Sequence, residues 1–348
     1  MSGGVEYNEA YEHNFVDEPL FAKEGTSLIH EKTRLLVKVS ALYYLDGMNQ
    51  QEISKKLGIS RPQVSRMLAA AKAEGIVQIT IKNPFSEEQA YERAIEEAFG
   101  IADSVVVNGG DADRPMVELM VARAAAALLE NVIKDGDVVG VMAGRTVGLV
   151  GAEMTHLGRK DVRFVPLVGG WGADGAAYHA NSNTRTFAER ARAKHYLLNA
   201  PAIVGSEEAK TLFVREREIG DVLQLARRCA VAVVGIGPVS EEASVVRSGY
   251  FDKTSIDEVA GLGAVSNLCT SFLNAQGEPV AYEAERRMIG LAANELRGIP
   301  NVIAAAVGEE KAAAIAAALR GRYVDALVTD MDTAKRVLAW HQAHPFLA

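Results

Sequence analysis

The chain has 348 residues and a formal net charge of −8, with 37 Lys and Arg against 45 Asp and Glu. Its hydrophobic content of 49% and charged content of 24% exclude a disordered or fibrous protein, and its length favours two domains because single cores stop growing at roughly 250–300 residues. No run approaches the ~18 consecutive apolar residues of a membrane-spanning helix, so we expect no association with a membrane.

The first 30 residues form an acidic segment with six acids and one lysine. They have neither the basic start nor the apolar run of a secretory signal, so we expect residues 1–30 to be a flexible tail and the protein to be cytoplasmic. The two cysteines, Cys229 and Cys269, lie 40 positions apart and outside any CxxC pair. This indicates two buried thiols in a reducing compartment, with no disulfide and no metal bound by them.

Residues 31–82 are basic, unlike the rest of the chain. This segment holds nine Lys and Arg against four Asp and Glu, a net charge of +5, which leaves −13 for everything else. A small basic module beside an acidic body indicates that the module alone contacts a polyanion.

Three helices are predicted within this basic segment. Apolar residues at helical spacing indicate the first over 33–46, and Asn49 can cap the second. Gly58 then supplies a turn that tolerates a left-handed backbone, and Ser60 can cap the third helix, which starts with RPQVSRM. Two short helices joined by a tight glycine-containing turn, the second basic at its start, form a helix-turn-helix.

The third predicted helix has the features of a DNA-recognition helix. Such a helix fits the major groove, where its arginines can bind guanine through two hydrogen bonds and its glutamine and serine can read neighbouring bases. Two lysines at the end of the preceding helix would hold the register on phosphates. The predicted DNA-binding residues are Lys55, Lys56, Ser60, Arg61, Gln63, Ser65 and Arg66. The alternative is an ordinary three-helix bundle with a solvated basic face.

A wing is predicted directly after the recognition helix. Residues 75–82 alternate apolar and polar side chains, as a half-buried strand does, and Asn83 and Pro84 then end the module. We therefore expect a helix-turn-helix DNA-binding domain over 31–84 and a second domain, for effector binding and oligomerisation, over 85–348.

From residue 100 onward, short apolar runs alternate with helical patterns, for example those over 117–130 and 311–320. The apolar runs are 104–107, 137–141, 162–168, 231–236, 301–307 and 323–329. Buried runs that alternate with helices indicate a largely parallel sheet. The predicted fold class is thus α/β, with a mostly parallel effector domain behind a winged-helix-like helix-turn-helix.

Glycine-rich loops follow four of these runs, at the strand ends where open α/β sheets bind ligands. Gly144 lets the backbone approach a ligand, and the free N–H groups of Arg145 and Thr146 would face an anion at a helix start. Lys311 follows the 301–307 run and can pair with a phosphate. These features favour a phosphorylated small molecule as the ligand of this site. No cofactor is expected, since no GxGxxG opens a helix here and no GxxxxGK[ST] occurs.

These motifs resemble the SorC family of bacterial sugar-responsive transcription regulators over residues 33–339. The resemblance is carried by the helix-turn-helix with its VSR, and by GRT (144–146), PLVGG (166–170), GIG (235–237), RMIGL (287–291) and GEEKAAAIAAALRG (308–321). It implies a sugar-binding domain related to glucosamine-6-phosphate deaminases and ribose-5-phosphate isomerases. It also implies operator DNA as a partner, a phosphorylated sugar or polyol as effector, and a homodimer or homotetramer on paired half-sites.

The resemblance further implies which residues bind the effector. Residues 144–146, with Lys311 opposite, would bind the phosphate. Other loops at strand ends, including a loop over 263–267, would bind the hydroxyl groups of the effector. The full set is Gly144, Arg145, Thr146, Gly169, Gly170, Asn181, Asn183, Gly235, Gly237, Asn267 and Lys311. The family usually reads Gly-Ala-Val-Gly-Asp in that last loop, whereas this chain has Ser266 and Asn267 in the last two places. An amide thus replaces a carboxylate, which leaves the identity of the effector open.

Two alternatives belong to other classes of protein. The body could be an active sugar-phosphate isomerase, deaminase or lactonase, for which the acid/base candidates are Asp174, His179, Asp330 and Asp332. No acid/base pair at a recognisable spacing occurs among them, so we expect no enzyme. The body could also be an anion-binding scaffold without an effector response. Trp171 could stack on a sugar or close the pocket. His341 and His344 lack a third ligand, so no metal site is predicted.

Overall fold

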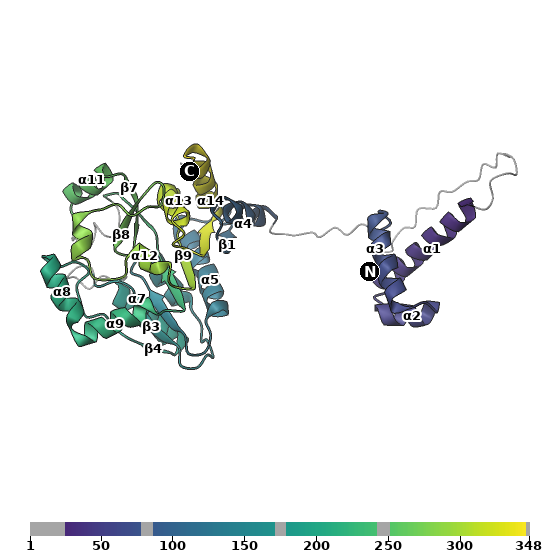
Figure 1. Cartoon of the computed structure of the whole chain (residues 1–348), viewed down its shortest axis with the longest axis horizontal. Helices are drawn as coiled ribbons and strands as arrows, with labels where there is room; N and C mark the ends of the chain where they lie inside the picture. The colour runs from purple at the N-terminus through teal and green to yellow at the C-terminus, as the bar shows by residue number, and fades with distance from the viewer. Residues whose placement is uncertain (1–24, 78–85, 171–178, 242–250, 346–348) are drawn as a thin grey trace. The chain divides into compact units, whose positions relative to one another are not determined.

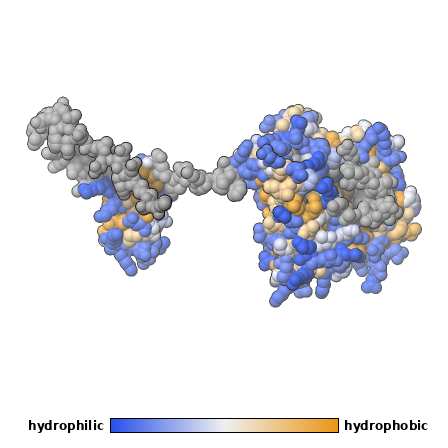
Figure 2. All heavy atoms as spheres, turned by 180° about the vertical axis from the view of Figure 1, so that it is seen from behind, coloured by the Kyte–Doolittle hydropathy of each residue, from blue (hydrophilic) through white to orange (hydrophobic). Residues whose placement is uncertain are grey.

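The computed structural model describes residues 25–77, 86–170, 179–241 and 251–345. The chain divides into two compact units, with the division between residues 83 and 84 (Figure 1). Polar side chains cover most of the surface seen in Figure 2, and apolar ones gather in smaller patches on each unit. None of the helices in the described ranges combines the length and the apolarity that a membrane span requires.

Three helices form the N-terminal unit. They are α1 (Gly25–Tyr44), α2 (Gln50–Leu57) and α3 (Arg61–Ala73). Their shared core consists of Val39, Leu42, Ile53, Val64 and Leu68. α1 begins inside the segment 1–30 that was predicted to be a flexible tail, so residues 25–30 are helical instead. Residues 1–24 of that tail, residues 78–82 of the predicted wing and the predicted domain boundary at 84 lie outside the described residues.

Local capping interactions fix the two short helices of this unit. Asn49 accepts the N–H groups of Gln51 and Glu52, and the Glu52 carboxylate accepts the N–H of Asn49 at 2.8 Å. Gly58, at φ 67°, ends α2 in the left-handed conformation that glycine adopts at little cost. A second capping box then starts α3 at Ser60. Because these contacts span at most a few residues, the local sequence is enough to specify the helix-turn-helix.

A seven-stranded parallel sheet forms the centre of the larger unit. Its order is β1 (Asp103–Val107), β10 (Ala326–Asp330), β9 (Asn301–Ala305), β5 (Val231–Val234), β2 (Val138–Val141), β3 (Arg163–Pro166) and β4 (Lys194–His195). Neighbouring strands pair in parallel throughout. Each of the six apolar runs overlaps a strand of this sheet, which confirms the predicted α/β class. The two-residue edge strand β4 was not predicted, because it carries no apolar run.

Helices cover the sheet and connect its strands. They are α4 (Ser86–Phe99), α5 (Arg114–Val132), α6 (Arg145–Glu153), α7 (Ala180–Ala191), α8 (Glu207–Arg215), α9 (Arg217–Arg227), α11 (Lys253–Gly261), α12 (Ala293–Leu296), α13 (Ala312–Arg320) and α14 (Met331–Ala343), with short 3-10 helices η1 (Glu283–Arg287) and η2 (Glu309–Lys311). α5 packs against α6, and the alanine-rich α13 is buried between α14 and the smaller sheet described next.

A three-stranded antiparallel sheet stands where the sequence indicated a loop. It consists of β6 (Gly237–Pro238), β7 (Ala264–Leu268) and β8 (Ser271–Asn274). Residues 263–267, predicted as a loop, thus lie almost wholly in β7. Cys269 and Thr270 form the turn to β8, with Cys269 at φ 52°. Tight hairpins usually place Asn or Gly at such a position, so the turn carries no recognisable hairpin signal in the sequence.

Both cysteines are free and buried, as predicted. Burial raises the pKa of the Cys229 thiol and of the Cys269 thiol to about 12. At neutral pH both therefore stay protonated and serve as small apolar core residues.

Glu285 fastens η1 to the smaller sheet. Its carboxylate accepts the N–H of Phe272, in β8, at 2.7 Å. Burial raises the pKa of Glu285 to about 7, against the opposing effects of this hydrogen bond and of the nearby Lys210. A carboxyl with a raised pKa binds more protons in the folded than in the unfolded chain. Its contribution to stability is therefore greatest below about pH 4.5 and is lost as the pH rises through 7.

Replacing Glu285 with glutamine should stabilise the protein more at pH 8 than at pH 5. The amide keeps an acceptor for the Phe272 N–H but removes the buried charge. Thermal unfolding should show a rise in Tm that is larger at pH 8 by about 2 °C. The control is Glu283→Gln, at an exposed carboxylate of the same 3-10 helix. Equal shifts at the two pH values for Glu285→Gln would contradict the buried-charge explanation.

Candidate functional site

The predicted DNA-binding residues lie on the exposed side of the helix-turn-helix. Lys55 and Lys56 lie in the last turn of α2, Arg61 starts α3 and Arg66 lies in its second turn. All four side chains are exposed. Ser65 is exposed as well, whereas Val64 beside it is buried in the core. The arginines form no ion pair with a carboxylate in the part of the chain that the structure describes; the Arg66 Nε donates to the Pro62 carbonyl at 3.4 Å. Both guanidinium groups are thus available to a polyanion.

Ser60 and Gln63 bind each other. The Gln63 Oε1 accepts the N–H of Ser60 at 2.8 Å and its hydroxyl at 2.9 Å, and the Ser60 Oγ accepts the N–H of Gln63 at 3.4 Å. These contacts close the capping box of α3. Both residues were predicted to bind DNA, but in the free chain they have a structural role. They cap α3 and so position the recognition helix, which explains why the motif has them at these positions.

In the larger unit, the parallel strands bring several predicted residues to one edge of the sheet. Gly144 follows β2, Gly235 follows β5, and the loop 308–311 follows β9. Gly144, at φ 122°, is the N-cap of α6, and it has no side chain to occupy the first N–H groups of that helix. The N–H groups at the start of α6, which include those of Arg145 and Thr146, can thus face a ligand at this edge.

Lys311 lies among the charges of this edge. Burial lowers its pKa; Glu310 and Glu118 act in the opposite direction, and Arg114 and Arg145 add to the lowering. Among the described residues, its Nζ forms no hydrogen bond or ion pair. Lys311 and Arg145, which are far apart in the sequence, therefore share one electrostatic environment and leave an ammonium group available for an anion.

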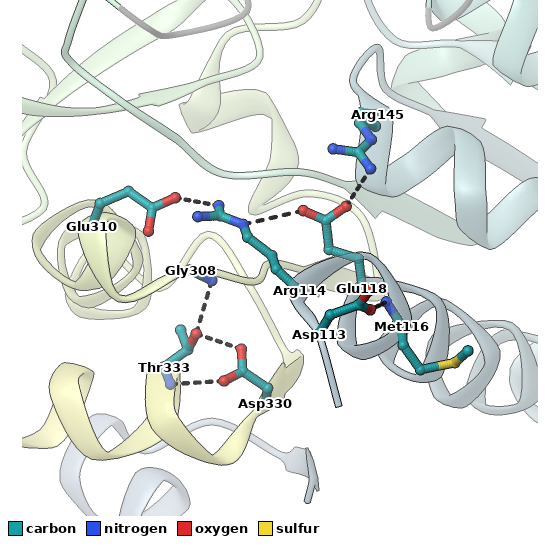
Figure 3. Close-up of polar contacts among 9 residues, drawn as sticks. All are labelled: Asp113, Arg114, Met116, Glu118, Arg145, Gly308, Glu310, Asp330 and Thr333. Carbon is teal, nitrogen blue, oxygen red and sulfur yellow. Dashed lines mark hydrogen bonds and ion pairs between the residues drawn. The ribbon is translucent and has the colours of Figure 1, made fainter. Parts of the chain in front are cut away.

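Figure 3 shows the ion pairs of this environment. Glu118, on α5, lies 2.9 Å from the Arg145 Nη2 and 3.4 Å from the Arg114 Nε. Arg114 also pairs with Glu310 on the other side. We call these five residues, Arg114, Glu118, Arg145, Glu310 and Lys311, the anion-site cluster. It holds three cations and two carboxylates.

Arg114 and Glu118 were missed by the sequence analysis. The apolar pattern over 117–130 indicated a core helix, which is α5. Its N-cap is Asp113, so Arg114 lies in its first turn. One signal was present: Glu118 lies at helical spacing from Val121, Ala122 and Ala125, all of which are buried. A carboxylate on the buried side of an apolar helix is expected to have a charged partner.

A hydrogen-bonded chain fixes the loop 308–311. The Thr333 Oγ1 accepts the N–H of Gly308 at 2.8 Å and donates to the carboxylate of Asp330, which also caps α14 (Figure 3). Asp330, an acid/base candidate from the sequence, is thus fully engaged in positioning backbone. Asp332 lies 3.7 Å from Lys335 at an exposed site.

The structure describes only one of the three remaining candidates from the sequence, His179. His179 is the N-cap residue of α7, and burial lowers its pKa. Asp174 and Trp171 lie outside the described residues.

The two predicted asparagines of α7 bind backbone carbonyl groups. The Asn183 Nδ2 donates to the carbonyls of Met142 and Gly144 at 3.1 and 3.0 Å, and Asn181 exchanges two hydrogen bonds with the backbone of Leu198. These amides therefore hold the strand-end loops in place. The loop of Gly144 in particular is fixed by a side chain from the neighbouring helix.

The remaining predicted residues have different local roles. A Cβ at Gly169 would lie 2.5 Å from the Pro201 carbonyl, so this glycine permits close backbone packing. Gly170 donates its N–H to the Ala200 carbonyl at 2.9 Å. The Asn267 amide faces Gly237 and donates to the Ser271 carbonyl at 3.1 Å.

No group of three metal-ligating side chains occurs among the residues that the structure describes. His341, one of the two C-terminal histidines, contacts Arg320 through its Nδ1 at 3.2 Å, and His344 stacks on Trp340. His341 therefore helps to hold α14 against α13, whereas the His344 ring packs on a residue of α14 itself.

Comparisons with known proteins agree with this division into two units. Residues 83–339 match the family described as "Putative sugar-binding domain", and residues 31–79 match a "Homeodomain-like domain". The "Deoxyribonucleoside regulator" of Bacillus subtilis is 31% identical over 310 residues, which cover 88% of this chain and 98% of that protein. A "Transcriptional regulator LsrR" of Klebsiella pneumoniae is 31% identical over 319 residues, 90% of this chain and 95% of that protein. The crystal structure of the full-length sorbitol operon regulator SorC from Klebsiella pneumoniae has a TM-score of 0.69 and 27% identity, covering 88% of this chain and 99% of that one.

Proposed function

Since this chain belongs to the SorC family of sugar-binding transcription regulators, we propose that a phosphorylated sugar or polyol, bound at the anion-site cluster, controls its binding to operator DNA. The regulated genes are those of a carbohydrate or polyol catabolic operon. The helix-turn-helix reads the operator through Arg61, Ser65 and Arg66, with Lys55 and Lys56 on phosphates. The domains extend over 31–84 and 85–348, and the protein acts in the cytoplasm.

This proposal is carried by Lys311, whose Nζ forms no hydrogen bond or ion pair with a described residue and which shares its electrostatic environment with Arg145. The anion-site cluster holds three cations and two carboxylates, so its net charge is +1 and it attracts an anion such as a phosphate. The free N–H groups at the start of α6 add hydrogen-bond donors for its oxygens. A neutral sugar could use the donors but would add no negative charge beside the ammonium of Lys311, whose charged form burial disfavours.

We propose further that the larger unit binds its effector without converting it. Of the three acid/base candidates in the described ranges, Asp330 is buried but caps α14, Asp332 is exposed beside Lys335, and His179 forms no hydrogen bond or ion pair with a described acid or base. None of the three thus belongs to a hydrogen-bonded acid/base pair of the kind that an enzyme of this class needs. Incubating the protein with any effector and following the compound by NMR tests this point, and turnover would show an enzyme.

A homodimer or homotetramer follows from the small size of the DNA-binding unit. One recognition helix contacts only a few base pairs, so specific binding requires a second half-site and a symmetric partner. Effector binding would then change the spacing or orientation of the paired units, provided that the effector binds one state several-fold better than the other.

The effector proposal is tested by thermal unfolding with a panel of ligands. The panel contains phosphorylated sugars, the corresponding free sugars, and polyols of three to six carbons. A ligand at 100 times its Kd stabilises by roughly 2.7 kcal/mol, which corresponds to a rise in Tm of about 5 °C for a unit of this size. Stabilisation by phosphorylated compounds alone supports the proposal. Stabilisation by free sugars or polyols alone contradicts it.

A further inference from the structure

The carboxylate of Glu310 lies across the loop that should receive a phosphate. Gly308 has φ 123° and no side chain, and a Cβ built on it would collide with both carboxylate oxygens of Glu310. The side chain of Glu310 thus folds back over the Cα of Gly308, two residues earlier. A negatively charged group of the protein itself already occupies the open backbone at this strand end.

The same carboxylate is bound to the cations of the site. It pairs with Arg114 (Figure 3), and among charged residues it has the largest influence on the pKa of Lys311. Burial acts to raise the pKa of Glu310, but the hydrogen bond from Arg114, a backbone hydrogen bond and the charges of Arg114 and Lys311 together outweigh burial, so this pKa lies below its ordinary value. Glu310 is therefore ionised at neutral pH and neutralises part of the positive charge that an effector would meet.

The two carboxylates of the cluster differ in how firmly they are held. Glu118 lies between Arg114 and Arg145, and its side chain is only 9% exposed. Glu310 has one ion-pair partner and a side chain that is 48% exposed. An incoming anion can therefore displace Glu310 into solvent at small cost, whereas Glu118 would lose two partners.

We propose that Glu310 is a specificity-determining residue, which occupies the anion site as an internal competitor and yields it to a phosphate dianion but not to an uncharged sugar or polyol. This inference rests on the proposed function, because it assigns a role at the same site. A dianion gains the contact with Arg114 that Glu310 gives up. A neutral ligand cannot replace the carboxylate at Arg114, so Glu310 stays in place.

The test compares phosphate binding by the wild-type chain with binding by Glu310→Gln and Glu309→Gln. Glu309 is the matched control, since it lies in the same 3-10 helix, is 58% exposed and pairs with Arg336 away from the cluster. The probe is inorganic phosphate, titrated calorimetrically into the full-length proteins at constant ionic strength. We expect the Kd of Glu310→Gln for phosphate to fall about tenfold, since one charge-assisted hydrogen bond no longer has to be displaced. We expect Glu309→Gln to stay within about twofold of the wild type.

The other outcomes overturn the inference. Equal or weaker phosphate binding by Glu310→Gln would mean that Glu310 positions Arg114 instead of competing with the ligand. An equal gain in Glu309→Gln would mean that the effect is one of net charge alone. If the wild type is stabilised by a phosphorylated compound of the panel while Glu310→Gln gains nothing, the role of Glu310 is wrong and the proposed function stands. If none of the three proteins binds phosphate or any phosphorylated compound, both are wrong.

Discussion

Replacing Arg66 with alanine should lower operator affinity by about a hundredfold or more and leave stabilisation by effector intact. Each arginine that binds guanine through two hydrogen bonds contributes ~1–3 kcal/mol of discrimination, and a symmetric oligomer presents Arg66 at least twice. The guanidinium is exposed on α3 and lies in a different unit from the effector site. The measurement is fluorescence anisotropy on an operator selected by the wild-type protein, combined with thermal unfolding with and without effector.

Lys38→Ala is the matched control for Arg66→Ala. Lys38 is an exposed cation of α1, outside the helix-turn-helix pair, so its loss removes the same charge from the same unit. It should weaken specific and non-specific DNA binding alike, and only slightly. A loss of effector stabilisation in Arg66→Ala, or an equal loss of affinity for non-specific DNA, would contradict the assignment of base reading to this residue.

The helix-turn-helix could be predicted from the sequence because its determinants are local. Asn49 and Glu52, like Ser60 and Gln63, are three positions apart, and each pair closes a capping box. Gly58 ends its helix through its own backbone conformation. The pattern also suggested that Ser60 and Gln63 read bases. It could not show that their polar groups bind each other, since either use fits the same spacing.

The parallel sheet could also be predicted from the sequence, because a strand that is buried on both faces must be apolar along its length. The smaller sheet was not. β7 and β8 meet through a Cys-Thr turn that has no typical turn residue, and β6 is two residues long. The loop predicted at 263–267 was therefore wrong for a physical reason: the strand is held by tertiary packing and cross-strand pairing instead of by local propensity.

The anion-site cluster could be predicted only in part. Glycine loops and lysine or arginine residues after strands indicated Gly144, Arg145 and Lys311, since all parallel strands end at one edge. Arg114 and Glu310, however, pair across 196 positions of sequence. No local spacing reveals such a pair, and the same holds for Asn183, which binds carbonyl groups about forty positions away.

Replacing Lys311 with methionine should weaken binding of the phosphorylated effector by about a hundredfold, because a charge-assisted contact to phosphate contributes ~1.5–3 kcal/mol. Methionine keeps the aliphatic length and removes the charge. Burial lowers the pKa of Lys311, so its charged form is disfavoured in the folded chain. The variant should therefore be at least as stable as the wild type without effector, and any lost response cannot be ascribed to misfolding.

The measurements for Lys311→Met are the effector-induced rise in Tm and the release or retention of operator DNA, with Lys194→Met as control. Lys194 is the first residue of β4 and lies next to Arg163, the first residue of β3, in the sheet. It therefore lies where the strands begin, whereas the effector site lies where they end. Full effector stabilisation in Lys311→Met would contradict the phosphate site. Operator binding that persists but no longer responds to effector would support it and exclude a scaffold without response. Lys311→Met and Glu310→Gln should change phosphate affinity in opposite directions although the two positions are adjacent, and a general disturbance of the loop cannot produce that pair of results.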